Sequence, residues 1–406
     1  MNTKLERTNK LLPWYLGLSD DLIFFAIINT IWLVEIKNFN PFQVTLLTTI
    51  SSMFCIVLQI PLLRIIKKIG NAKSIQIGSF ILLLSSILLT FSERYIWFII
   101  AMILYELSFI FKNMGDILLK NNLNYLNHSS EFLFAKTKAN TIYAVLTAII
   151  ALLSGYIFHL NSYLPMILGI SVCILTFMMS LFLFDITDKR NSKGEIGFST
   201  KQKFQLPDSK RFSLIMLFLY GLFYGIVVVG QRNGQLLIQF NLKEFLDLET
   251  VATVMGIIIF ISRICRISSN FVFLKLYQKY HDKVITILSF ELLFSFLFLL
   301  LGSYLNGLFW LKVVIMTFGF SLILEVRAPI KTYMQNLTLN SFTEDHHQNM
   351  ITYLGFFRKI GTILCGGLIS CVLSRFSINI AIFVLLLGGI ITIVLSFLLE
   401  IEIKKR

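Results

Sequence analysis

Charged residues are scarce in this sequence: Asp, Glu, Lys and Arg together make up only 14% of its 406 residues. A water-soluble globular protein usually carries about 25% charged residues. The scarcity excludes an ordinary soluble domain and indicates a protein that resides in lipid.

The motifs of common enzymes and cofactor sites are also missing. The 5 cysteines are scattered through apolar segments without C-x-x-C spacing, which argues against a metal site and a disulfide framework. No G-x-x-x-x-G-K-[ST] loop occurs, so this chain is not expected to use ATP itself. No H-E-x-x-H motif, thiol pair or Ser-His-Asp set that could serve a membrane enzyme is found. We expect no enzymatic activity, no metal and no cofactor.

Apolar runs of membrane-spanning length fill the chain, which is 56% hydrophobic and has a mean hydropathy of +0.78. Crossing about 30 Å of hydrocarbon takes roughly 20 apolar residues in a helix. Helix is the expected form because an unpaired backbone group in lipid is costly. We therefore predict an all-α polytopic membrane protein with twelve transmembrane helices, over residues 12–36, 42–66, 74–92, 96–119, 138–159, 163–185, 212–240, 250–274, 284–305, 309–335, 350–373 and 377–400.

Basic residues are distributed unevenly among the connections between these spans. With the amino terminus in the cytoplasm, the outer loops hold only Lys37, Arg94, Lys243 and Arg375, and the inner connections and tails hold most of the rest. This asymmetry follows the positive-inside rule, so we predict that both termini are cytoplasmic. The rule also explains the formal net charge of +14 without a nucleic-acid partner. We expect a multi-pass protein of a bacterial plasma membrane.

A basic stretch near the middle of the chain separates two similar halves. Residues 185–211 contain no membrane-length apolar run and include seven Lys or Arg residues. Related segments recur on either side at a nearly constant separation: LRIIKKIG begins at Leu63 and LKLYQKYH at Leu274, and Trp97 and Trp310 open corresponding spans. Such recurrence indicates an internal repeat. We predict an amino-terminal six-helix bundle over 1–186, a cytoplasmic basic linker over 187–211 and a carboxy-terminal six-helix bundle over 212–406.

With these features the chain resembles the major facilitator superfamily (MFS) over essentially its whole length. The family's G-x-x-x-D-R-x-G-R-K loop after the second span corresponds here to Leu63, Lys67, Lys68, Gly70 and Lys73, with Lys67 in place of the acidic residue. The resemblance implies the MFS fold of two six-helix pseudo-repeat bundles. It also implies secondary active transport by alternating access, often coupled to protons. We expect a monomer whose partners are the lipid bilayer, a small-molecule substrate and protons.

Acidic side chains within the first-half spans are candidates for proton coupling. An ionisable group at membrane depth costs a few kcal/mol, so it should face an aqueous cavity or a partner. Asp20 and Asp21 lie about 13 Å along the first span, and Glu106 lies near mid-depth in the fourth. Two neighbouring carboxylates in a poorly solvated place suit a proton carrier. We predict proton coupling at Asp20, Asp21 and Glu106. Alternatively, the two aspartates cap or hydrogen-bond a distorted turn at residues 17–19.

Substrate binding is predicted in the second half. Arg263 and Arg266 share one helix face, and arginine suits bidentate binding of carboxylate or phosphate. Pairing with Glu291 or Glu325 is the alternative role for these two arginines. Residues 230–235 place polar groups between two glycines, which is typical of a broken helix that lines a site or of the outer end of a shorter span. The substrate-binding candidates are Gln231, Arg232, Asn233, Arg263, Arg266 and Glu325.

The resemblance also implies a cytoplasmic gate at the inner ends of several spans. Ion pairs between the two halves would break there when the transporter opens inward. The gate candidates are Lys68, Gly70, Asp116, Arg327, Arg358 and Lys359. A simpler role for Asp116 is a salt bridge to Lys112, four residues earlier on the same span.

We predict proton-coupled efflux of a small amphipathic compound. The direction rests on the resemblance and on the absence of a sugar-porter signature. An alternative with the same fold is import of an anionic nutrient bound by Arg232, Arg263 and Arg266. A membrane enzyme or lipid-handling protein is a further alternative, which the missing catalytic motifs disfavour.

Overall fold

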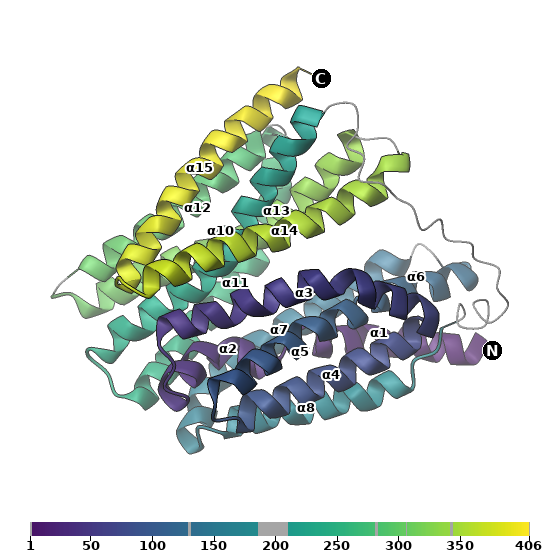
Figure 1. Ribbon diagram of the computed structural model, residues 1–406, viewed down its shortest axis with the longest axis horizontal. Coiled ribbons are helices and arrows are strands. Elements are labelled where there is room, and N and C mark those ends of the chain that lie inside the picture. The colour runs from purple at the N-terminus through teal and green to yellow at the C-terminus, as the bar shows by residue number, and fades with distance from the viewer. Residues whose placement is uncertain are drawn as a thin grey trace. The chain divides into compact units, whose positions relative to one another are not determined.

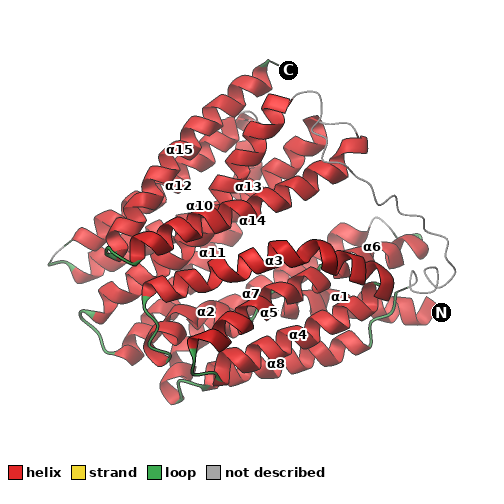
Figure 2. Cartoon of the chain, in the orientation of Figure 1, coloured by secondary structure: helices red, strands yellow, loops and turns green. Residues whose placement is uncertain are grey.

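The computed structural model describes residues 2–128, 131–185, 210–280, 283–305, 307–341 and 344–405. Within these residues the regular elements are helices, and no strand occurs among them (Figure 2). Figure 1 labels them α1 (Asn2–Ser19), α2 (Ile23–Ile31), the π-helix η1 (Trp32–Ile36), α3 (Pro41–Ile69), α4 (Asn71–Phe91), α5 (Tyr95–Lys112), α6 (Met114–Tyr125), α7 (Phe132–Leu160), α8 (Leu164–Leu181), α10 (Lys210–Lys243), α11 (Leu248–Tyr280), α12 (Val284–Tyr304), α13 (Phe309–Ser341), α14 (Glu344–Leu373) and α15 (Ile378–Lys404).

The described residues contain 12 helical stretches long and apolar enough to cross a membrane. The first stretch, Thr3–Ile36, combines α1, α2 and η1, and the fourth, Tyr95–Leu123, combines α5 with most of α6. Their positions agree with the predicted spans, which confirms the prediction of a polytopic all-α membrane protein. The cytoplasmic placement of both termini stays a prediction.

The first span is not one continuous helix. Helix α1 ends at Ser19, residues 20–22 form a bend, and α2 begins at Ile23. Backbone groups freed by a break at membrane depth must find partners within the protein. The break therefore places Asp20 and Asp21 where the chain most needs polar contacts.

Two compact units make up the chain. Unit 1 consists of Met1–Asn29 and Ile50–Gln202, and unit 2 of Thr30–Thr49 and Lys203–Arg406. The end of the first span and the start of the second thus belong to unit 2 together with the carboxy-terminal helices. Residues 186–209, which include nearly all of the predicted basic linker, lie outside the described residues, and the linker stays a prediction.

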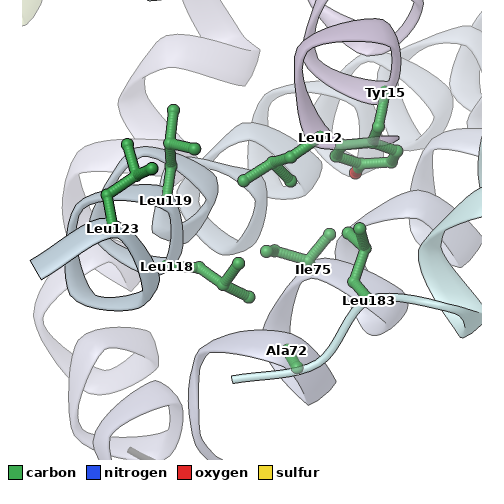
Figure 3. Packing of buried hydrophobic residues seen from close by; sticks show 8 residues of the cluster. All are labelled: Leu12, Tyr15, Ala72, Ile75, Leu118, Leu119, Leu123 and Leu183. Carbon is green, nitrogen blue, oxygen red and sulfur yellow. The ribbon is translucent and has the colours of Figure 1, made fainter. Parts of the chain in front are cut away.

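Helix α4 packs against α5 and α8 in unit 1. A cluster of apolar side chains packs α1, α4 and α6 against one another (Figure 3). The polar tip of Tyr15 in this cluster is satisfied, because its hydroxyl lies 2.7 Å from Ser79 Oγ. The members are Leu12, Tyr15, Ala72, Ile75, Leu118, Leu119, Leu123 and Leu183.

Unit 2 is organised around α10, which packs against α13, α14 and α15. The α10–α14 contact is close because glycines meet across it: a Cβ added to Gly361 would lie 1.8 Å from the carbonyl oxygen of Gly221. Gly221 and Gly225 form a G-x-x-x-G pattern on α10, and a Cβ on Gly225 would lie 2.4 Å from Gly361 O. Small residues at this spacing allow helices in membranes to approach through their backbones.

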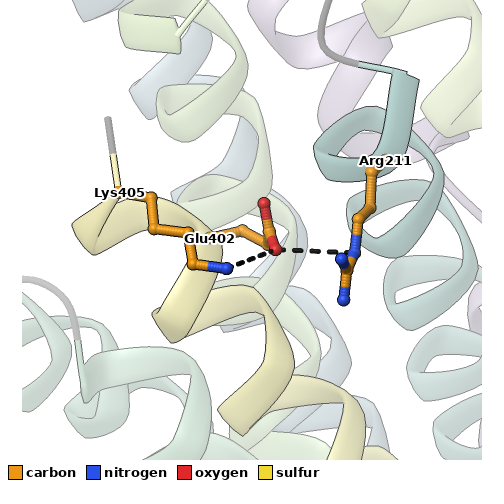
Figure 4. Close-up of polar contacts among 3 residues, drawn as sticks. All are labelled: Arg211, Glu402 and Lys405. Carbon is orange, nitrogen blue, oxygen red and sulfur yellow. Dashed lines mark hydrogen bonds and ion pairs between the residues drawn. The ribbon is translucent and has the colours of Figure 1, made fainter.

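A small ion-pair cluster joins the start of α10 to the end of α15 (Figure 4). Arg211 Nε lies 3.5 Å, and Lys405 Nζ 3.4 Å, from Glu402 Oε1. Both basic side chains are largely exposed, so each pair contributes at most about 1 kcal/mol. The cluster orients two helix ends more than it stabilises unit 2.

Candidate transport sites

Asp21 anchors the break in the first span to α5. Its Oδ1 accepts a hydrogen bond from the Leu22 backbone N–H at 2.7 Å and another from the Tyr105 hydroxyl. This arrangement agrees with the alternative in which an aspartate hydrogen-bonds a distorted turn, although the distortion lies at residues 20–22. Asp21 therefore has a structural role in unit 1, and its proton coupling stays a prediction.

Lys112 closes the same break from α5. Its Nζ donates a hydrogen bond to the carbonyl of Ser19, the last residue of α1. The side chain is buried, lies 4.6 Å from the centroid of the Phe109 ring, and interacts electrostatically with Asp20 and Asp21. A lysine thus satisfies a backbone group freed by the break.

The expected salt bridge between Lys112 and Asp116 is wrong. Helix α5 ends at Lys112 and α6 begins at Met114, so the regular spacing of four residues on one helix is interrupted at Asn113. The Lys112 ammonium group turns toward α1, where its electrostatic partners are Asp20 and Asp21. Asp116 is half-buried in the first turn of α6, where a negative charge complements the helix dipole.

The other two acidic candidates, Asp20 and Glu106, differ from Asp21 in their exposure and partners. Asp20 is exposed and has no hydrogen bond or ion pair within the described part of the chain, apart from its electrostatic interaction with Lys112. Glu106 is half-buried on α5, next to Tyr105, and its backbone carbonyl accepts a weak bond from Cys55 Sγ at 4.0 Å. One polar site at the break thus gathers Asp20, Asp21, Tyr105 and Lys112, with Glu106 beside it.

Gly70 connects α3 to α4, and Lys68 lies in the last turn of α3. Gly70 has a φ of +88°, which glycine adopts without strain, and its carbonyl accepts bonds from Ser74 N at 3.1 Å and Ser74 Oγ at 2.6 Å. Lys68 is exposed. Gly70 therefore shapes the turn into α4, and a gating role for both residues stays a prediction.

The predicted helix break at residues 230–235 is wrong, because α10 runs continuously from Lys210 to Lys243. The two glycines serve packing instead. A Cβ on Gly230 would lie 2.5 Å from Phe296 Cζ, and one on Gly234 would lie 3.1 Å from Leu299 Cδ1. They make room for side chains of α12 while the backbone stays helical.

Arg232 and Asn233 connect α10 to the start of α3 within unit 2. Arg232 Nη1 donates hydrogen bonds to the Val44 carbonyl at 3.1 Å and to Thr48 Oγ1 at 2.8 Å. Asn233 is buried, and its Oδ1 accepts a bond from Thr45 Oγ1 at 3.4 Å. These contacts hold two helices together, and substrate binding by these residues stays a prediction.

Cationic side chains converge on Tyr224 from two other helices of unit 2. Arg358 Cζ on α14 lies 5.0 Å, and Arg327 Cζ on α13 lies 5.8 Å, from the centroid of the Tyr224 ring. Arg327 also donates to the Tyr224 hydroxyl at 3.4 Å and to Gln231 Oε1 at 3.1 Å. Lys331 acts electrostatically on the same phenol. The substrate candidate Gln231 and the gate candidates Arg327 and Arg358 therefore belong to one cluster.

A pair of carboxyl groups lies on the next helices of unit 2. The carboxyl groups of Glu291 of α12 and Glu325 of α13 interact electrostatically with each other, and Glu325 also interacts with the thiol of Cys265 on α11. Glu325 was predicted to bind substrate, and its pairing with Glu291 was not predicted. An acidic residue at depth in each of two successive spans was the available signal.

Three candidates remain: Arg263, Arg266 and Lys359. Arg263 is buried on α11, and its Nε has no hydrogen-bond partner among the described residues. Arg266 and Lys359 are half-buried, on α11 and α14. Their predicted roles in substrate binding and gating stay predictions.

Among the described residues, twelve apolar helices with polar clusters between them indicate a polytopic membrane protein. The sequence matches the description "Major Facilitator Superfamily" over residues 15–364. The chain belongs to the Major Facilitator Superfamily, and it is a multi-pass transporter of a small molecule rather than an enzyme.

Solved structures give the same fold. The chain is similar to the crystal structure of the nucleoside transporter NupG, with a TM-score of 0.74 and 13% identity, and the match covers 100% of both chains. A mutant of NupG matches with a TM-score of 0.72 and 11% identity over 97% of this chain and 99% of that one. No curated protein matches this sequence. At such identities the likeness shows the fold alone.

Proposed function

We propose that this chain couples proton movement to the transport of a small amphipathic compound across a bacterial plasma membrane by alternating access. The observation that supports coupling is the electrostatic interaction between the carboxyl groups of Glu291 and Glu325. Two neighbouring carboxylates that are both ionised repel each other, and a proton shared between them removes that repulsion. The pair is therefore a place where the transporter holds a proton.

The positions of this pair suit proton loading. Glu291 lies seven residues after the start of α12 at Val284, or about 10 Å along its axis. Glu325 lies near the middle of α13, and both side chains are half-buried. Two ionised carboxylates in contact at such depth repel each other. Release of the proton must therefore be accompanied by a change in their surroundings, which alternating access supplies.

Substrate charge decides the direction of coupled transport. A cationic amphipathic compound binds best where carboxylates have lost their protons, so proton and compound exchange, and an inward proton gradient drives efflux. The exposed carboxylate of Asp20 at the break of the first span supports this choice. We therefore keep efflux as the leading direction.

Import of an organic anion is the second candidate. An anion binds best when nearby carboxyl groups are protonated, so the two move together and the same gradient drives uptake. The cationic cluster around Tyr224 favours this candidate. Because Glu325 and Arg327 lie two positions apart on α13, proton and anion would be bound on the same helix.

Proton movement in proteoliposomes tests the proposal. The purified chain is reconstituted with an internal pH-sensitive dye, and ethidium, uridine or benzenesulfonate is added outside. Uridine represents the nucleosides named for NupG. We expect one of the three compounds to change the internal pH. Ethidium that enters in exchange for protons would raise it, and benzenesulfonate that enters together with protons would lower it.

Substitutions identify the proton site. Glu291→Gln and Glu325→Gln should abolish proton movement but retain exchange of labelled substrate across the membrane, because exchange needs no net proton transfer. Asp20→Asn and Glu106→Gln are compared in the same assay. Glu6→Gln, an exposed position on α1, is the matched control and should behave as wild type. Wild-type transport that ignores a pH gradient would remove the coupling proposal.

A further inference from the structure

We propose that Tyr224, Arg327 and Arg358 form a binding site for a small organic anion that carries an aromatic or apolar part. This inference rests on the second candidate function, import of an anion, and names its substrate class and site. The three residues come from α10, α13 and α14, all within unit 2.

Convergence of like charges is the first argument. Two guanidinium groups lie within about 6 Å of the centroid of one ring, the range of cation–π attraction. From these distances, 5.8 and 5.0 Å, the two groups lie no more than about 11 Å apart. An anion bound near both groups would offset their like charges. Planar guanidinium groups bind carboxylate, sulfonate or phosphate oxygens through paired hydrogen bonds.

The aromatic side chains supply the second argument. The rings of Tyr220 and Tyr224 lie 5.9 Å apart at an interplanar angle of 52°. Both are buried, and Arg358 interacts electrostatically with Tyr220 as well. Two aromatic rings beside two arginines fit a ligand with a charged end and an apolar body, whereas an inorganic anion would leave the rings unused.

Access from water is the third argument. Gln231, Arg327 and Arg358 are half-buried, and Lys331 on the following turn of α13 is exposed. The guanidinium groups are therefore not sealed within the core of unit 2. Lys331 extends the positive field toward the solvent and draws anions to the site.

Position on α13 separates this site from the carboxyl pair. Residues two apart on a helix point roughly 200° apart. Arg327 faces Tyr224 and Gln231 of α10, while Glu325 contacts Glu291 of α12. Removal of the negative charge of Glu325 by a proton would strengthen anion binding on the other side of the same helix.

Direct binding tests the site without any proton gradient. Calorimetric titration of the purified chain in detergent compares benzenesulfonate and phenyl phosphate with neutral benzenesulfonamide, which has the same ring. We expect both anions to bind at least about tenfold more tightly than benzenesulfonamide, a difference of about 1.4 kcal/mol. Equal affinity for charged and neutral compounds in the wild type would overturn the site.

Arginine variants then locate the bound anion. Arg358→Gln and Arg327→Gln should each weaken benzenesulfonate binding about tenfold or more, and Arg358→Lys should lose less because it keeps the charge without the planar donors. Arg375→Gln, an exposed position after α14, should bind as wild type. Both glutamine variants are first shown to keep the wild-type melting temperature. Wild-type affinity in both would refute the assignment.

Failures of the site and of the proposed function are distinguishable. If benzenesulfonate binds through these arginines but moves no protons in proteoliposomes, the coupling proposal fails and the site stands. If it is transported with protons while both arginine variants bind it normally, the site fails and the function stands.

Discussion

Gly361→Ala should destabilise unit 2 through the contact between α10 and α14. A Cβ at position 361 would lie 1.8 Å from the carbonyl oxygen and 2.3 Å from the carbonyl carbon of Gly221. Real Cβ atoms essentially never approach another atom within 3.0 Å, so the two backbones must separate by at least about 1.2 Å. The obstacle is backbone, which cannot rotate away as a side chain can.

Two effects of this substitution oppose each other. Alanine in place of glycine in a helix interior is worth about 1 kcal/mol in favour of the variant. Overpacking of a close contact costs about 1 to 3 kcal/mol, and a backbone clash lies toward the upper end. The clash therefore wins, and we expect a net loss of roughly 1 to 2 kcal/mol, or a melting temperature lower by about 2 to 8 °C.

Thermal unfolding of the detergent-solubilised chain measures this loss. The matched control is Gly367→Ala on the same helix, because an added Cβ there has no atom within 4 Å. It should equal or exceed the wild type in melting temperature, since only the helix propensity changes. Equal melting temperatures for the two variants would show that α10 and α14 do not approach as closely as described.

Three further predictions concern single polar contacts. Lys112→Met should lower stability by about 1 to 3 kcal/mol because it leaves the Ser19 carbonyl without its donor; thermal unfolding equal to wild type would contradict this. Arg232→Met should lose a similar amount through its two bonds to α3, whereas exposed Arg94→Met should not. Hydrogen bonds from Thr250 and the first backbone amides of α11 lower the pKa of the Asp247 carboxyl group. The ionised carboxylate therefore contributes fully to folding stability at neutral pH, and this contribution is lost as the pH falls through the lowered pKa. Asp247→Asn should flatten the acid side of the plot of melting temperature against pH; an unchanged acid side would argue against this bond.

The spans were predictable because their signal is local. About 20 apolar residues in sequence suffice to identify a membrane helix, whatever surrounds it. The break at residues 20–22 depends instead on Tyr105 and Lys112, which lie far along the chain. The sequence indicated that Asp20 and Asp21 needed partners, but it could not name them.

Glycines show why the second half was harder to interpret. The polar stretch from Gly230 to Gly234 indicated a broken helix or the end of a shorter span, but α10 continues through it and both glycines accommodate side chains of α12. The pattern G-x-x-x-G at Gly221 and Gly225 was present in the sequence and marks the real close contact. The pairing of Glu291 with Glu325 depends on how α12 and α13 face each other, which no local pattern reveals.

Lys112 also bears on how the chain is inserted into the membrane. Chains are made from the amino terminus, so the first span is complete before the fourth has been synthesised. Until α5 arrives, the Ser19 carbonyl lacks the lysine that satisfies it in the finished unit. The first span should therefore enter the bilayer as an unbroken helix, or remain in contact with water that satisfies the Ser19 carbonyl. It should bend only when α5 packs beside it.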